Sequence, residues 1–341
     1  MVEKDNLGIW FKKFAENECA GSSPLYEFLS SKIAENDDML AISSYALAGQ
    51  PIPNLFLAAV HQLLLKGKGH ALASFYPSLA EHPQDKSQSF QHFKEFCLTH
   101  REEIIKILQT RLVQTNEVGR CGYLYPCFSY IYEQTGKPLA IIEIGTSGGL
   151  QLLWDQYRYS YEGSQTYGNQ ASSIQITSIC KGKNKPMIRL TSPPVTHRIG
   201  IDLHVNDLMN PEDYSWLQSL IWPEHHDRRA IFKQASQIVS EHQLDLIEGN
   251  GVELLVDSVS KIPESSTICV FHTHVANQIP KQEKHELEAT IKQLGQSRDI
   301  YHLYNNMWDA DLHLDSFING VEKKRRVGMT DGHGKWFTWA L

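Results

Sequence analysis

The pattern of apolar and polar positions divides the chain into a helical first part and an alternating second part. In residues 1–136, apolar residues recur three and four positions apart, which is the spacing of an amphipathic helix. This spacing predicts helices in LGIWFKKFAENECA, SPLYEFLSSKIAEN, PNLFLAAVHQLLLKGKG, SFQHFKEFCLTHREEIIKILQTR and TNEVGRCGYLYPCFSYIYEQTG. Strand patterns are nearly absent here, so we expect an all-α N-terminal region that ends at Gly136.

From residue 137 onward, short apolar runs alternate with helical stretches. PLAIIEIG is a continuous apolar run that suits a parallel strand buried on both faces. Further strands are predicted in HRIGIDL, LDLIEGN, STICVFHT and RDIYHLYNN, and helices between most of them in EDYSWLQSLIW, RRAIFKQASQIVSEH and KQEKHELEATIKQLG. Such alternation predicts an α/β domain over residues 137–341, with a mostly parallel sheet covered by helices on both faces.

Two segments depart from this alternation. Residues 161–195 are rich in turn-forming residues, and we expect an inserted β-hairpin there. LHLDSFING and KWFTWAL have no helix between them, which predicts an antiparallel pair at the C-terminal edge of the sheet.

Composition narrows the class of protein. Of 341 residues, 41% are hydrophobic and 21% charged, which is ordinary for a globular chain, and the net charge of -7 argues against a nucleic-acid binder. The basic run KKRR at 323–326 fits a solvated strand or turn. Six scattered cysteines without a C-x-x-C pair indicate reduced, buried thiols. The start, MVEKDNLGIWFKKF, is unlike a signal peptide, and no apolar run reaches the ~20 residues of a membrane span. We expect a cytoplasmic protein whose partners include neither nucleic acid nor membrane.

The loop GTSGG after the first predicted strand has two interpretations. It matches G-x-S-x-G, the elbow that presents a nucleophilic serine, here Ser147, with an acid and a histidine later in the chain. It also matches the glycine loop that opens a nucleotide-binding sheet. The second interpretation is favoured, because a nucleophile elbow normally follows several strands of its sheet and this loop follows the first.

EIGTSGG, RIGIDL and IEGNG, in this order on successive predicted strands, resemble S-adenosylmethionine-dependent methyltransferases of the Rossmann-like class. The resemblance covers residues 137–341 and implies that fold and that cofactor. The expected antiparallel pair at the end is also typical of the class. With QTNEVGRC before the glycine loop and LIWPE after the second strand, the whole chain resembles more closely a family of uncharacterised bacterial proteins that carries a domain-of-unknown-function label.

The resemblance implies roles for the residues of the loop. Glu143 stands at the acid of the acid-x-G-x-G-x-G pattern, and Gly145 and Gly149 stand at its outer glycines. Glycine lets the backbone approach a ligand closely because it has no Cβ. Ser147 replaces the middle glycine, which is a departure from the pattern.

Three further residues match cofactor-binding positions. Asp202, at the end of RIGID, stands where an acid accepts hydrogen bonds from the ribose hydroxyls. Asn250 stands where an acid often contacts the adenine amino group, and its amide oxygen can accept the same bond. Arg120 can form a charge-assisted bond to the methionine carboxylate, or an ordinary surface ion pair with Glu117.

His272 and His274, at the end of the fourth predicted strand, are the candidate catalytic residues. By strand alternation their side chains are expected on the same face. A neutral histidine can contact the acceptor or remove its proton. Structural histidines, and a metal site completed by His302 or His204, are the alternatives.

The sequence thus predicts methyl transfer from S-adenosylmethionine to a small-molecule acceptor, with the helical region acting as a lid that contacts the substrate. Two other functions stay open. One is a non-catalytic, metabolite-binding protein with the methyltransferase fold, and the other is a serine hydrolase that uses Ser147. No bound metal is predicted, and no motif indicates the oligomeric state.

Overall fold

A computed structural model describes residues 4–341 of the chain, which form two compact units. Residues 1–3, the start of the segment that is unlike a signal peptide, lie outside the described residues. The helical unit comprises the chain up to residue 115 together with 209–230, and the sheet unit comprises 116–208 and 231–341. The first boundary between the units therefore lies after residue 115 rather than at Gly136. The helical unit also includes residues 209–230, from the second part of the chain.

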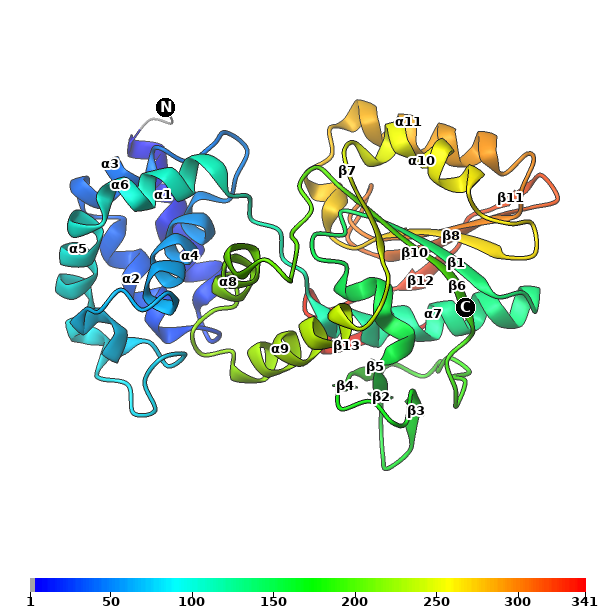
Figure 1. Cartoon of the computed structure of the whole chain (residues 1–341), viewed down its shortest axis with the longest axis horizontal. Coiled ribbons are helices and arrows are strands. Elements are labelled where there is room, and N and C mark those ends of the chain that lie inside the picture. The colour runs from blue at the N-terminus through cyan, green and yellow to red at the C-terminus, as the bar shows by residue number, and fades with distance from the viewer. Residues whose placement is uncertain (1–3) are drawn as a thin grey trace. The chain divides into compact units, whose positions relative to one another are not determined.

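The helical unit is built around one helix that is apolar on all sides. That helix, α4 (Ile52–Leu65), is almost wholly buried, as expected for a helix inside a bundle. Side-chain oxygens of Ser23 and Asn36 cap the helices that follow them. The other helices of the unit are α1 (Lys4–Phe14), α2 (Pro24–Ile33), α3 (Asp37–Ser43), α5 (Ser89–Thr99), α6 (Arg101–Thr110), α8 (Pro211–Ser219) and the start of α9 (His226–Ser240) (Figure 1).

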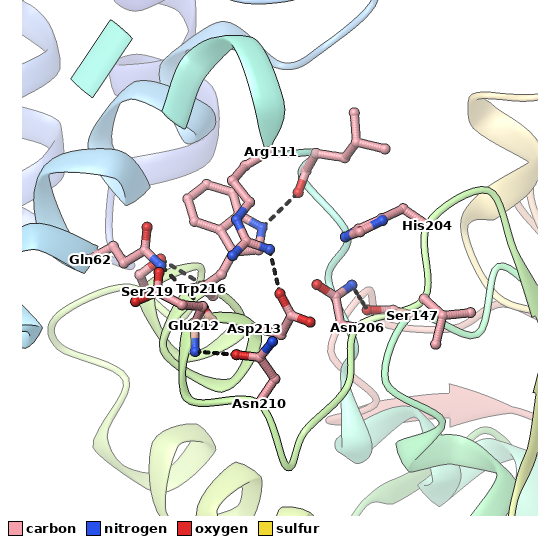
Figure 2. Close-up of polar contacts among 12 residues, drawn as sticks. Gln62, Arg111, Ser147, His204, Asn206, Asn210, Glu212, Asp213, Trp216 and Ser219 are labelled. Atoms are coloured by element: carbon pink, nitrogen blue, oxygen red, sulfur yellow. Dashed lines mark hydrogen bonds and ion pairs between the residues drawn. The ribbon is translucent and has the colours of Figure 1, made fainter. Parts of the chain in front are cut away.

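Residues 209–230 join the helical unit because α8 is tied to the end of α6. Trp216 is fully buried, and its indole Nε1 donates to the carbonyl oxygen of Leu112 at 2.9 Å. Arg111 Nη1 lies 2.5 Å from Asp213 Oδ1, as Figure 2 shows. These contacts join residues about a hundred positions apart, which no local periodicity reveals.

The sheet unit contains a mixed, mostly parallel sheet in the order β11-β10-β9-β8-β1-β6-β7. Strands β1, β6, β7, β8 and β9 run parallel to one another, and β10 is antiparallel to β9, β11 and β12. The bounds are β1 (Leu139–Ile144), β6 (Val195–Asp202), β7 (Asp245–Glu248), β8 (Thr267–His272), β9 (Ile300–Tyr304), β10 (Leu312–Ile318), β11 (Val321–Lys323) and β12 (Arg326–Gly328). The predicted α/β class, with a helical N-terminal region and a mostly parallel sheet, is confirmed.

Helices cover both faces of this sheet (Figure 1). The helices α10 (Gly251–Ser260) and α11 (Lys281–Leu294) lie on one face, and α7 (Cys121–Thr135) lies on the other. Alternate residues of β1, such as Ile142, pack with Leu255 of α10 and Leu287 of α11. Burying one such side chain contributes about 1.5–3 kcal/mol, so the continuous apolar strands anchor the fold.

The smaller strands depart from two expectations. Residues 158–181 form an antiparallel hairpin, a third strand that pairs with it in parallel, and a separate strand, which is more than the single hairpin expected. The strands are β2 (Arg158–Ser160), β3 (Thr166–Gly168), β4 (Gln175–Thr177) and β5 (Ile179–Lys181). The C-terminal strand β13 (Trp336–Thr338) pairs in parallel with β5, so it does not form the antiparallel pair expected with LHLDSFING. That pairing is made instead by β11 and β12, the short strands that contain the ends of the KKRR run.

Candidate functional site

The candidate site lies where the strand order of the sheet reverses. From β1 the chain adds β6 and β7 on one side, and then returns to place β8 and β9 on the other side. The carboxyl ends of β1 and β8 are therefore neighbours at a topological switch point, which is where open α/β sheets bind ligands. The glycine loop follows β1, and His272 ends β8.

The glycine loop is tightly folded. Gly145, Ser147 and Gly149 all have positive φ, at 76°, 51° and 76°. A Cβ on Gly145 would lie 1.9 Å from Val275 Cγ2, so this glycine is required where the segment after β8 packs on the loop. The loop leads into a short 3₁₀ helix, Leu150–Gln156.

Ser147 is held by the end of β6 and the residues that follow. Its backbone amide donates to Asp202 Oδ2 at 2.7 Å, and the other carboxylate oxygen accepts from the amide of His204 at 3.2 Å. Asn206 donates from its backbone amide to the Ser147 carbonyl at 3.1 Å, and from Nδ2 to the hydroxyl at 3.2 Å (Figure 2). Ser147 is buried, so these partners fix a left-handed serine that would otherwise be strained.

Glu143 lies beneath the loop, on the sheet face opposite α10 and α11. It is buried, and its carboxylate accepts a hydrogen bond from the Thr146 hydroxyl at 2.7 Å. Burial raises the pKa of Glu143 well above its ordinary value, and the nearby Asp202 carboxylate raises it further. Glu143 therefore supports the loop from below.

Arg120 joins three segments of the sheet unit. Its Nε donates to the Gly332 carbonyl at 2.9 Å, and its Nη1 donates to the carbonyl and hydroxyl oxygens of Thr273, at 3.3 and 3.2 Å. The Thr273 hydroxyl donates in turn to Gln151 at 3.1 Å. Arg120 is buried, so the side chain expected to approach a cofactor carboxylate also ties the end of β8 to the loop 330–336.

His274 lies beside the glycine loop, because the next residue, Val275, packs on Gly145. Its own backbone is left-handed, with φ of 62°. The Nε2 atom is buried and has no hydrogen-bond partner in the described part of the chain. Burial and, to a lesser extent, the positive charge of Arg120 lower the pKa of His274 to about 3, so the ring is neutral at neutral pH.

His272 and His274 do not share a face, contrary to the expectation from strand alternation. Strand β8 ends at His272, and the left-handed turn at His274 redirects the chain. His272 packs on the face covered by α11, where its Nε2 lies 3.1 Å from His302 Nε2. Both rings are buried, and burial lowers the pKa of each.

Asn250 caps a helix. Its Oδ1 accepts from the amide of Val252 at 2.8 Å at the start of α10, and its Nδ2 donates to Glu283 at 3.3 Å. The residue lies two positions after the end of β7.

The two histidines named for a possible metal site, His302 and His204, lie in different surroundings. His302 does lie against His272, whereas His204 Nδ1 lies 3.3 Å from Glu248 Oε2. Within residues 4–341, no group of three or more histidine, cysteine, aspartate or glutamate side chains is arranged to hold a metal ion. All six cysteines are buried and unpaired, as predicted. No helix within the same residues is long and apolar enough to cross a membrane.

Several residues of the site were not singled out from the sequence. Asn206, Gln151, Thr273 and the loop 330–336 contact the candidate residues only through long-range hydrogen bonds. The one local signal was the sequence DGHG, whose glycines and aspartate are typical of a tight turn.

Comparison with known proteins supports the sequence resemblance at the level of the family. No curated protein and no solved structure matches the chain. A family model described as an uncharacterised protein conserved in bacteria, DUF2332, matches residues 9–339. The chain therefore belongs to this bacterial family.

Proposed function

We propose that the protein transfers a methyl group from S-adenosylmethionine to a small-molecule acceptor. The observation that carries the proposal is the bond between Asp202, at the end of β6, and the amide of Ser147 in the loop after β1. It brings the candidate ribose-binding acid to the candidate cofactor loop beside the switch point of a parallel sheet, where such sheets bind nucleotides.

The residues of the loop fit this cofactor. Ser147 adopts the left-handed conformation that a glycine would adopt at the middle position, so the substitution preserves the path of the backbone. Its hydroxyl oxygen accepts a hydrogen bond from Asn206 Nδ2. Both carboxylate oxygens of Asp202 accept backbone amides, and a carboxylate, with about four lone-pair sites, is the kind of group that accepts hydrogen bonds from ribose hydroxyls. When bound, the cofactor supplies an electrophilic methyl group on a sulfonium.

His274 is the residue proposed to contact the acceptor. It follows β8 directly beside the loop, and its neutral ring has a buried nitrogen without a partner among residues 4–341. A group of this kind can orient the acceptor toward the methyl group, and alignment is most of what methyl transfer requires. His272 is left out of the proposal, because its ring packs against His302 on the other face.

Calorimetry with S-adenosylmethionine and S-adenosylhomocysteine tests the cofactor. We expect both to bind the purified chain, and Asp202→Asn to weaken both at least about tenfold through loss of a charged acceptor. Asp257→Asn, on the exposed side of α10, is the matched control and should bind as the wild type does. No heat with either ligand at sub-millimolar concentration would overturn the proposal.

Binding without turnover would point to the non-catalytic alternative. In that case both ligands bind, and no methyl group is lost from S-adenosylmethionine across a broad screen of acceptors. A measurable transfer to any acceptor excludes it.

A further inference from the structure

Two neighbouring asparagines hold His274 at both its backbone and its ring. The Asn305 Oδ1 accepts a hydrogen bond from the His274 amide at 2.8 Å, and Asn305 is fully buried. Asn306 Nδ2 lies 3.1 Å from His274 Nδ1. Both His274 and Asn306 are left-handed, with φ of 62° and 58°. Residues other than glycine are uncommon in this conformation, and such residues cluster at functional sites.

The contact with Asn306 decides which ring nitrogen carries the hydrogen. In the orientation that the Asn306 amide has in the structure, its NH₂ group faces Nδ1 of His274 and donates, so Nδ1 is the acceptor. In a neutral imidazole the other nitrogen then carries the hydrogen. The buried Nε2 atom of His274 is therefore an N–H donor.

This donor has no acceptor within residues 4–341. The Nε2 atom is buried there without a partner, and an unpaired buried donor is unfavourable until a ligand supplies an acceptor. The groups around it favour negative charge. Arg120 binds the preceding residue, Thr273, and its positive charge acts on the ring, as that of His333 does when protonated. Asp331 is the opposing charge, and one of its oxygens accepts from the amides of His333 and Lys335.

We propose that the methyl acceptor of this site is a carboxylate, which His274 binds through Nε2–H and does not deprotonate. This inference rests on the proposed methyl transfer. A carboxylate oxygen forms the new bond to the methyl carbon while the bond from that carbon to sulfur breaks. The negative charge of the acceptor and the positive charge of the sulfonium cancel, giving a methyl ester and a neutral thioether. No proton is released, so no general base is needed.

An amine, thiol or alcohol acceptor that His274 deprotonates would need the opposite arrangement. To take that proton, the ring needs a lone pair on Nε2 and a hydrogen on Nδ1. Asn306 would then have to present its oxygen to the ring. The two classes of acceptor therefore predict different tautomers of one histidine.

Nitrogen NMR of the full chain labelled with ¹⁵N-histidine distinguishes them. His274→Gln assigns the signals, since those of His274 disappear. We expect the Nε2–H tautomer at neutral pH, and Asn306→Asp to reverse it, because a carboxylate at that position accepts from Nδ1–H. An Nδ1–H tautomer in the wild type would overturn the proposal.

Acetate serves as the carboxylate probe in the same experiment. We expect a saturable change in the His274 Nε2 signal with acetate, and none with methylammonium or with chloride at equal ionic strength. An unchanged signal, or an equal response to chloride, would also count as refutation. These measurements need no S-adenosylmethionine, so failure of cofactor binding in calorimetry is a separate result.

Discussion

Asp202 and Ser147 are 55 positions apart in the sequence, yet the Asp202 carboxylate accepts the Ser147 amide at 2.7 Å. The same carboxylate accepts the amide of His204. One side chain thus closes the loop after β1 and the turn after β6.

Replacing this carboxylate should destabilise the loop. The amide in Asp202→Asn presents one oxygen and one NH₂ group, so one of the two backbone donors loses its acceptor. We expect a loss of about 1.5–3 kcal/mol in the free energy of unfolding, measured by urea denaturation. The exposed control Asp257→Asn should stay within about 0.5 kcal/mol of the wild type. Equal stability of the two variants would contradict this role of Asp202.

The left-handed conformation of Ser147 predicts an order of stability among its variants. Both Ser147→Gly and Ser147→Ala lose the hydroxyl that bonds to Asn206, but only glycine relieves the strain at φ of 51°. We expect Ser147→Gly to be more stable than Ser147→Ala by about 1 kcal/mol. An alanine variant as stable as the glycine variant would show that the serine backbone is not strained.

Ser147 should not react as a nucleophile. Its hydroxyl is bonded to an amide of Asn206 rather than to a histidine, and an amide does not accept the proton that an attacking serine must lose. We expect no labelling of the wild type by a fluorophosphonate probe. Labelling that disappears in Ser147→Ala would revive the serine hydrolase interpretation.

Gly145 and Val275 form a pair that can be tested by compensation. Gly145→Ala places a methyl group on Val275, so the loop or the segment after β8 must move. We expect a loss of about 2–4 kcal/mol from the clash and the positive φ together. Val275→Ala in the same chain should restore part of this loss, whereas additive effects in thermal or urea unfolding would show that the two residues are not in contact.

Arg120 should control the order of the C-terminal loop. Arg120→Ala removes the donor to Gly332 and both bonds to Thr273. We expect faster hydrogen exchange at the amides of residues 330–336, with Arg101→Ala in the helical unit as the control. If exchange in that loop does not change, Arg120 does not hold it in place.

Stability should fall as the pH falls below about 6. Burial lowers the pKa of His272 and His61 to about 3, while the unfolded chain titrates near the ordinary value of ~6.5. Between these values the unfolded state binds more protons, so acid favours unfolding by up to about 1.4 kcal/mol per pH unit for each histidine. The stabilisation is complete above pH ~6.5.

The pH effect can be assigned with one variant. Glutamine does not titrate, so His272→Gln should reduce the difference in unfolding free energy between pH 7.5 and 5.5. His82→Gln, in an exposed segment, should leave that difference unchanged. A His272→Gln variant that keeps the full pH dependence would exclude this histidine as a source.

Local patterns in the sequence determined the class of the fold and the order of its main elements. The apolar run of β1 predicted a buried strand, and the glycines after it predicted a tight turn. Both predictions are confirmed, because a buried strand and a tight turn depend on residues close together in the chain. The same is true of most helices, whose apolar spacing records a face that has to be buried.

Only the tertiary structure decided which strands, helices and side chains contact one another. The pairing of β13 with β5, the return of α8 to the helical unit and the bond from Asp202 to Ser147 join residues far apart in the chain. His272 and His274 illustrate the limit most clearly, since one left-handed residue after the strand sends them to different surroundings. Hydrogen bonds and burial between distant segments determine these contacts. They produce no periodic pattern of apolar and polar residues from which the contacts could be predicted.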